Sequence, residues 1–267
     1  MSKLRELFGN SKPIIGMINL LPLPTYPGYS TMDKVLEAAL TDAKALIEGG
    51  IHGLLVENTF CMPIDSDIEP HLTASMAICT HEIVKISKVP VGVVVNMEPG
   101  DKSSLGVAVA AGARFIRSVS FNEAVLTSFG VFQGRPAEMT RYRARLGAAD
   151  IAVFCDIHVK HTTMIAERSL EESAMAVKLT GMEGIIVTGG GTGNAPPVET
   201  PARVKKAVGK MPVLLGSGLT VENAKELLSV ADGAIVGSYF KKEGVYTNPV
   251  DVEKVRQVVE VSQQLGA

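Results

Sequence analysis

The chain has few cysteines and lacks any long apolar run. Cys61, Cys79 and Cys155 are odd in number, far apart and in apolar company. This pattern predicts buried, reduced thiols and argues against a disulfide framework or a cysteine zinc site. No apolar stretch approaches the ~20 residues that cross a bilayer, and the N-terminal residues lack the apolar core of a signal peptide. We therefore expect a cytoplasmic protein with no membrane span.

The sequence also lacks a basic excess and an evident linker. Its 26 Lys and Arg against 28 Asp and Glu give a formal net charge of −2, which argues against a general nucleic-acid binder. The hydrophobic fraction of 46% is enough for one large core. The length of 267 residues is close to the ~250 typical of one (β/α)₈ barrel. We predict a single domain spanning residues 1–267.

Short apolar runs rich in valine and isoleucine alternate with helical patterns along the chain. Such runs are typical of strands buried on both faces of a parallel sheet. The connections that follow several of these runs are long, which is typical of functional loops at the carboxyl ends of strands. The pattern predicts an α/β fold, a (β/α)₈ TIM barrel. The eight predicted strands are residues 13–19, 53–58, 91–96, 114–119, 151–158, 184–188, 212–216 and 233–237.

Two glycine-containing loops follow the last two predicted strands, where (β/α)₈ barrels frequently bind phosphate. Glycine lets backbone amides approach a ligand closely, and the serine hydroxyls can add hydrogen bonds. Tight turns need the same glycines, but their position after both strands favours an anion site. The residues predicted to bind phosphate or substrate here are Gly216, Ser217, Gly218, Gly237 and Ser238, with Thr188 and Gly189 at the end of the sixth strand.

Three residues with chemically useful side chains lie at the end of the fifth predicted strand. Because side chains alternate along a strand, Asp156 and His158 are expected on one face, with Lys160 beside them if the chain stays extended. An acid, an imidazole and an amine suit proton transfer or oxyanion binding. Lys160 can form a Schiff base if burial lowers its pKa. The alternative is a structural network of ion pairs, and two potential ligands are too few to predict a metal.

Other predicted strands also end in polar residues on the expected inner face. Glu57 is predicted to act as a base or to orient Lys160, and Arg117 to clamp a second anionic or hydroxylated part of a substrate. A polar layer that only supports the barrel is the alternative for each of them. The remaining predicted binding residues are Asn19, Asn58 and Asn96.

Two of the long connections have features of their own. The glycine-rich segment 189–194 is predicted to close over a phosphate or move as a lid, although a flexible connection explains it equally well. It is not a P-loop, because no Gly-Lys-Ser/Thr follows at the required spacing. The predicted loop 120–135 carries Phe121, Phe129 and Phe132. These aromatic residues are expected to form the interface of a homo-oligomer or to cover the site.

Segments along nearly the whole chain resemble the BtpA/SgcQ family. They include residues 15–24, 49–58, 156–161, 216–220 and 248–251. The resemblance implies a TIM-barrel-like fold. For function it implies either a link to photosystem I biogenesis, after which the family is named, or an accessory enzyme of a carbohydrate operon. It carries no established catalytic residues.

The glycine loops and the polar strand ends together give one functional hypothesis. It is a metabolic enzyme that acts on a small phosphorylated, sugar-phosphate-like substrate by acid–base or carbonyl chemistry, as a lyase, aldolase or isomerase does. Asp156, His158, Lys160 and Glu57 are the predicted catalytic residues. The alternatives are a non-catalytic assembly or regulatory factor of the BtpA type and a metal-assisted hydrolase using Glu57, Asp156 and His158. We predict a small anionic metabolite as partner and no cofactor, with a divalent metal required only by the hydrolase alternative.

Overall fold

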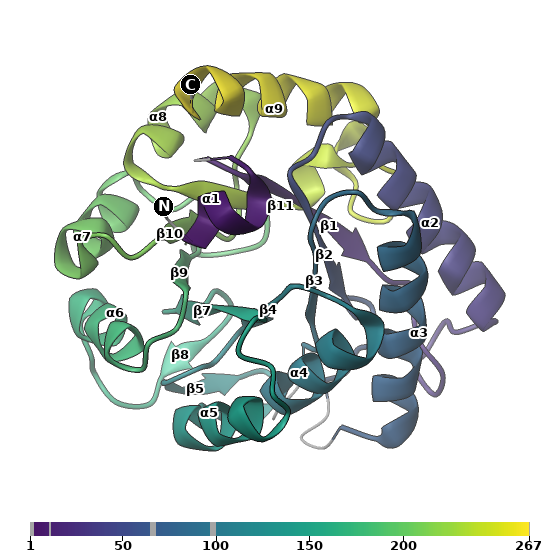
Figure 1. The fold of residues 1–267 in the computed structure, drawn as a ribbon, viewed down its shortest axis with the longest axis horizontal. Coiled ribbons are helices and arrows are strands. Elements are labelled where there is room, and N and C mark those ends of the chain that lie inside the picture. Colours follow the sequence, from purple (N-terminus) through teal and green to yellow (C-terminus); the bar gives the residue numbers. More distant parts are fainter. Residues whose placement is uncertain (1–2, 11, 65–67, 97–99, 267) are drawn as a thin grey trace.

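The computed structural model describes residues 3–10, 12–64, 68–96 and 100–266. Parallel strands close into a barrel in the order β1-β2-β3-β4-β7-β9-β10-β11 (Figure 1). This closed barrel confirms the predicted α/β class and the (β/α)₈ TIM-barrel architecture. Residues 65–67, which belong to one of the long connections, lie outside the described part. The barrel strands are β1 (Ile14–Asn19), β2 (Gly53–Glu57), β3 (Val91–Val94), β4 (Phe115–Ser118), β7 (Ala152–Ile157), β9 (Gly184–Val187), β10 (Val213–Leu215) and β11 (Gly233–Val236).

The helices surround the barrel as an outer ring (Figure 1). Local sequence sets several of their starts: Thr31 accepts the N–H of Lys34 at 3.3 Å, and Asn223 accepts the N–H of Thr220 at 2.9 Å. Among the described residues, no helix is both long and apolar enough to cross a bilayer. The helices are α1 (Lys3–Phe8), α2 (Met32–Glu48), α3 (Pro70–Ile86), α4 (Gly100–Ala111), α5 (Pro136–Arg145), α6 (Leu170–Leu179), α7 (Glu199–Val208), α8 (Val221–Val230) and α9 (Val252–Gly266), with the short 3₁₀ turns η1 (Ser238–Phe240) and η2 (Lys242–Gly244).

Two separate apolar clusters fill the molecule, one between the barrel and the helices and one inside the barrel. The residues of β7 alternate between the two clusters: Val153 joins the outer cluster, whereas Ala152 and Phe154 join the inner one. Helix α1 lies over one end of the barrel (Figure 1). Its Phe8 ring packs edge-on against Phe115, with 5.3 Å between ring centroids. Together these contacts close the barrel at the amino ends of its strands.

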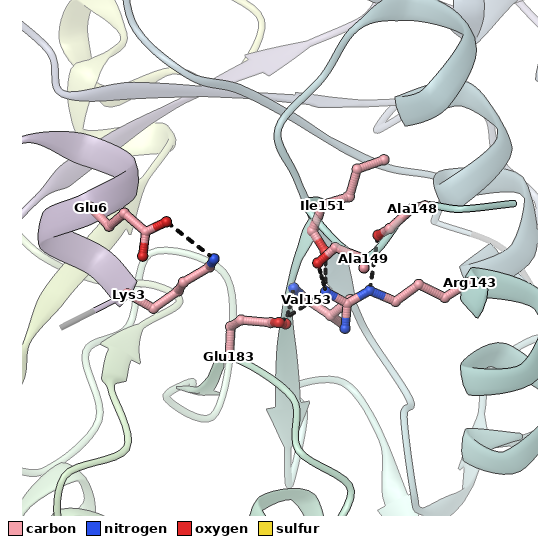
Figure 2. A network of polar contacts seen from close by, with 8 residues as sticks. All are labelled: Lys3, Glu6, Arg143, Ala148, Ala149, Ile151, Val153 and Glu183. Carbon is pink, nitrogen blue, oxygen red and sulfur yellow. Dashed lines mark hydrogen bonds and ion pairs between the residues drawn. The ribbon is translucent and has the colours of Figure 1, made fainter. Parts of the chain in front are cut away.

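A polar network ties the helix ring to the same end of the barrel. Arg143 near the end of α5 donates hydrogen bonds to the carbonyls of Ala148 and Ile151 at 3.1 and 2.5 Å, and to Glu183 at 2.9 Å. Glu183 also accepts the N–H of Val153 at 2.8 Å. Figure 2 shows the Arg143 guanidinium at the centre of this network. It therefore holds α5 to the starts of β7 and β9.

Replacing Arg143 with methionine is expected to lower the free energy of unfolding by about 2–3 kcal/mol, because several charged hydrogen bonds are lost together. Ligand affinity should not change, since the network lies at the amino ends of the strands, away from the candidate site. Urea unfolding measures the loss of stability. The matched control is Arg141→Met, which removes an exposed arginine of the same helix and should cost less than about 0.5 kcal/mol. Equal losses in the two variants would contradict this account.

The predicted loop 120–135 contains strands that the sequence reading missed. β5 (Ala124–Thr127) and β6 (Gly130–Gln133) form a hairpin, and β8 (Thr163–Met164) pairs with β5 to complete an antiparallel sheet outside the barrel. Phe121 and Phe132 are buried, whereas Phe129 is 38% exposed. Phe121 belongs to the apolar cluster between the barrel and the helices, and Phe132 is buried in β6. Two of the three aromatic residues are therefore not part of an exposed surface. The homo-oligomer stays a prediction.

Candidate functional site

A cavity of about 240 Å³ lies at the carboxyl ends of the barrel strands. Its volume is just below the ~300–1,000 Å³ of pockets for drug-sized ligands, so it suits a small metabolite. It brings together most of the predicted polar residues from the ends of different strands. The predicted residues on its wall are Asn19, Glu57, Arg117, Lys160, Gly216, Ser217, Gly218, Gly237 and Ser238.

The loops after β9 and β10 are bound to each other through Ser217. Its hydroxyl accepts the N–H of Gly189 at 3.1 Å and donates to the carbonyl of Asn194 at 2.9 Å. The hydroxyl is thus already engaged within the protein. An anion at this loop would be met by backbone N–H groups other than that of Gly216, which donates to the carbonyl of Val187 at 2.7 Å.

Close backbone contact between these loops explains two of the glycines. Gly218 has φ +75°, and a Cβ atom there would lie 2.0 Å from the backbone nitrogen of Ala195. A Cβ atom on Gly189 would lie 2.3 Å from the carbonyl oxygen of Asn194. Real Cβ atoms do not approach backbone so closely. Glycine is therefore required at both positions by the contact between the loops, whether or not a ligand binds.

The loop after β7 is bound to the loop after β9. Thr188 accepts the backbone N–H of Lys160 at 3.0 Å. One residue further on, the His161 ring and the Thr192 hydroxyl are 3.0 Å apart, within hydrogen-bonding distance. Thr188 does not line the cavity. Its hydroxyl holds the backbone from which the Lys160 side chain extends.

Arg117 lines the cavity and is paired with Asp156. The guanidinium of Arg117 donates from Nε and Nη2 to the two carboxylate oxygens of Asp156, at 2.7 and 2.9 Å. Asp156 is fully buried and does not reach the cavity wall. Burial alone would lower the pKa of Arg117, but the Asp156 carboxylate more than offsets this and the net pKa is raised. Asp156 therefore positions Arg117 and keeps it charged.

Lys160 presents an amine to the cavity. Burial and the positive charge of Arg117 lower its pKa, while Glu57 and Asp156 act in the opposite direction. A lysine whose pKa is lowered exchanges protons more readily near neutral pH. The cavity therefore combines a carboxylate, a permanent cation and an amine that can titrate.

A chain of hydrogen bonds links Glu57 to the opposite wall. The Thr59 hydroxyl donates to Glu57 at 3.1 Å and accepts from Asn19 at 2.7 Å. The Asn19 amide also donates to the Tyr246 hydroxyl at 3.3 Å. Its carbonyl oxygen, Oδ1, is buried without a partner. Buried acceptors are rarely left unpaired, so this oxygen suits a hydroxyl donor on a ligand or a water molecule.

Tyr246 is a cavity residue that sequence reasoning missed. It lies in the connection between β11 and α9 and packs against Phe60, with ring centroids 5.3 Å apart. Lys241 and the backbone of Val250 both bind Asp42 of α2, which fixes the two ends of this connection. Burial, with the charge of Glu57, raises the pKa of Tyr246 to about 12. It is therefore a neutral hydroxyl at physiological pH.

The structure differs from the expected extended chain at His158. The backbone there has φ +45°, and its N–H donates to Glu123 at 2.9 Å. The His158 ring lies 3.8 Å from Glu123 and does not line the cavity. The turn ends the alternation that predicted His158 beside Asp156. The catalytic role of His158 stays a prediction.

Two of the predicted asparagines lie outside this cavity. The Asn58 side chain accepts the backbone N–H of Asn96 at 2.7 Å and so connects the ends of β2 and β3. Neither residue lines the cavity that contains Glu57. This hydrogen bond holds the ends of the two strands together.

The residues proposed for metal-assisted hydrolysis do not form one set of ligands. Asp156 is committed to Arg117, His158 faces Glu123, and Glu57 is held by Thr59. Within the ranges that the structure describes, no three His, Cys, Asp or Glu side chains are grouped as a metal ion would require. The donors present therefore do not fit a metal at these residues.

Solved structures with similar folds include several barrel enzymes. (S)-3-O-geranylgeranylglyceryl phosphate synthase from Thermoplasma acidophilum has a TM-score of 0.62 and 19% identity, over 99% of each chain. 3-Hexulose-6-phosphate synthase from Salmonella typhimurium has a TM-score of 0.61 and 13% identity, over 94% of this chain and 99% of the other. At these identities the likeness shows the shared fold.

Relatives by sequence span nearly the whole chain. An uncharacterized Archaeoglobus fulgidus protein is 34% identical over 94% of this chain and 99% of its own. The Escherichia coli protein SgcQ is 31% identical over 97% of each chain. The Synechocystis photosystem I biogenesis protein BtpA is 31% identical over 96% of this chain and 89% of its own. Residues 10–264 match the model of the BtpA family, and the chain belongs to that family.

Proposed function

We propose that the protein is an enzyme that binds a small phosphorylated metabolite and moves protons with Glu57 and Lys160. The phosphate would lie against the backbone of Gly216, Ser217, Gly218, Gly237 and Ser238, which we call the anion cradle. The observation that carries the proposal is the cavity itself, whose wall contains both the anion cradle and these two side chains. A lyase, aldolase or isomerase of a sugar phosphate uses this combination of an anion site with an acid–base pair.

The chemistry of the cavity supports a phosphate as the anion. Backbone amides and two cations, Lys160 and Arg117, share the wall with a single carboxylate, that of Glu57. The loops that carry the cradle follow the last two barrel strands, where barrels frequently bind phosphate. Structures with the same fold include a synthase in complex with sn-glycerol-1-phosphate and a hexulose-6-phosphate synthase.

Phosphorylated compounds are expected to bind, whereas their unphosphorylated counterparts are not. Calorimetry with dihydroxyacetone phosphate, sn-glycerol 1-phosphate, dihydroxyacetone and glycerol tests this, with inorganic phosphate as competitor. Lys160→Met should weaken phosphate affinity at least tenfold, or about 1.4 kcal/mol. Lys34→Met, which removes an exposed lysine of α2, should leave it unchanged. Absence of binding by inorganic phosphate and by every phosphorylated compound would overturn the proposal.

The same titrations should depend on pH in a defined direction. The phosphate group is a dianion well above its second pKa of ~6, so the affinity at higher pH follows the charge of Lys160. Because the pKa of Lys160 is lowered, affinity should fall as pH rises through a value below 10.5. The Lys160→Met variant should not show this fall.

One observation favours a second candidate, an assembly or regulatory factor. The antiparallel sheet outside the barrel exposes Leu126, Val131 and Ile165, at 51%, 59% and 54%. Exposed apolar residues gathered on one element are typical of protein-binding surfaces, and one relative is named for photosystem I biogenesis. This candidate predicts that Lys160→Met leaves the biological activity intact and that no phosphorylated compound binds.

A further inference from the structure

The amine of Lys160, a half-buried residue, differs from the amines of three other lysines that are half-buried or buried. Lys12 donates to backbone carbonyls, while Lys205 and Lys241 pair with aspartates. Across the described ranges, the Nζ atom of Lys160 forms no hydrogen bond or ion pair, although it faces the cavity. Burying an amine without a partner costs free energy. A lysine without a partner in a ligand cavity is therefore a candidate for a catalytic role.

The surroundings of Lys160 favour its neutral form. Burial lowers the pKa of its amine, and the positive charge of Arg117 acts in the same direction, against the smaller opposing effects of Glu57 and Asp156. Arg117 cannot give up its proton, because Asp156 binds it on two atoms. The arrangement therefore makes the amine of Lys160 the group that loses a proton. A neutral amine is the nucleophile that attacks a carbonyl group.

Lys160 and the anion cradle are parts of one rigid frame. The backbone of Lys160 is bound to Thr188, and the next residue, Gly189, is bound to the Ser217 hydroxyl of the cradle. A ligand whose phosphate lies in the cradle has its remaining atoms inside a cavity of about 240 Å³. The carbons near the phosphate therefore lie close to the Lys160 side chain. This is how a bound substrate gains the advantage of proximity.

We propose that Lys160 forms an imine with a small phosphorylated aldehyde or ketone held at the anion cradle. This inference rests on the proposed function and adds to it the substrate class and the covalent step. The Nζ lone pair attacks the carbonyl carbon, the C=O π electrons move to the oxygen, and a proton gives a carbinolamine. Water then leaves as the C=N bond forms. Overall, R–NH₃⁺ and O=C become R–NH⁺=C and water, so no oxidant or external proton is needed.

Glu57 has the position to carry the proton within this step. Its carboxylate shares the cavity with Lys160, and the Thr59 hydroxyl donates to its Oε2 atom. It accepts a proton from the ammonium group before attack and returns a proton to the departing hydroxyl. Tyr246 stays neutral, since its pKa is raised to about 12, and can hydrogen-bond to the carbonyl oxygen.

Reductive trapping tests the imine directly. The intact protein is incubated with glycolaldehyde phosphate or dihydroxyacetone phosphate and sodium borohydride, and the adduct is located by peptide mass spectrometry. We expect one main adduct, on Lys160. Its yield should be at least tenfold lower with unphosphorylated glycolaldehyde, or when excess inorganic phosphate is present. Lys160→Arg keeps a cation but has no amine that can form an imine, so it should lose the adduct. Lys34→Arg is the matched control and should be labelled like the native protein.

The pH dependence separates Lys160 from ordinary lysines. The phosphorylated compound is kept at a saturating concentration, because its affinity falls as Lys160 loses its proton. Trapping at Lys160 should then rise with pH and reach its plateau at a lower pH than trapping at exposed lysines, whose pKa is ~10.4. Phosphate binding without an adduct, or with adducts spread evenly over surface lysines, would overturn the imine and leave the proposed phosphate enzyme standing. Absence of both binding and adduct would overturn the two together. An adduct of equal yield in Lys160→Arg would also overturn the assignment.

Discussion

Replacing Asp156 with asparagine is expected to lower the free energy of unfolding by about 3–5 kcal/mol, because a buried cation loses its charge partner. Arg117 is only 6% exposed and Asp156 is not exposed at all. The guanidinium cannot become neutral to escape the penalty, since arginine stays protonated in proteins. Urea unfolding followed by circular dichroism measures the change. The same variant should also weaken phosphate binding, because Asp156 fixes the orientation of Arg117 at the cavity.

The double variant Arg117→Met/Asp156→Leu provides the control. Removing both charges together leaves no uncompensated ion, so most of the lost stability should return. Ligand binding should remain weak, because the arginine that faces the cavity is gone. The double-mutant cycle isolates the pairwise energy. If Asp156→Asn lowered the free energy of unfolding by less than about 1 kcal/mol, the Arg117–Asp156 ion pair would not be buried away from water.

The barrel could be predicted from the sequence because its signal is local and repeated. Each strand is an apolar run of β-branched residues, and each run is followed by a helical period. Alternation within such a run also accounts for Phe154 in the barrel interior and Val153 in the outer layer. The same rule placed Glu57, Arg117 and Lys160 near one another. These three residues line the same cavity.

The alternation rule fails where contacts with distant parts of the chain turn the backbone out of the extended conformation. At His158 the turn is held by Glu123, which lies directly before β5 of the antiparallel sheet. Tyr246 reaches the cavity because Asp42 of α2 fixes the loop that carries it. The sequence around these two residues does not indicate where their side chains lie. Long-range contacts of this kind decide which polar side chains of a barrel mouth face a ligand.

Replacing Gly218 with alanine is expected to damage both the fold and the anion cradle. The φ of +75° costs a residue with a side chain about 1–2 kcal/mol. The new Cβ would also lie 2.0 Å from the nitrogen of Ala195 and 2.2 Å from the carbonyl carbon of Asn194, an overpacking that costs about 1–3 kcal/mol. The two loops must then separate. We expect stability to fall by about 2–5 kcal/mol and phosphate affinity to fall at least tenfold.

Gly181 offers a control for the backbone strain alone. It has φ +74°, and a Cβ atom there would meet nothing within 4 Å. Gly181→Ala should therefore lose only the conformational part, about 1–2 kcal/mol, and should bind phosphate as the native protein does. Urea unfolding and calorimetry on both variants separate the two effects. If Gly218→Ala bound phosphate as tightly as Gly181→Ala, the loop contact would have no part in shaping the anion cradle, and the phosphate would have to lie elsewhere in the cavity.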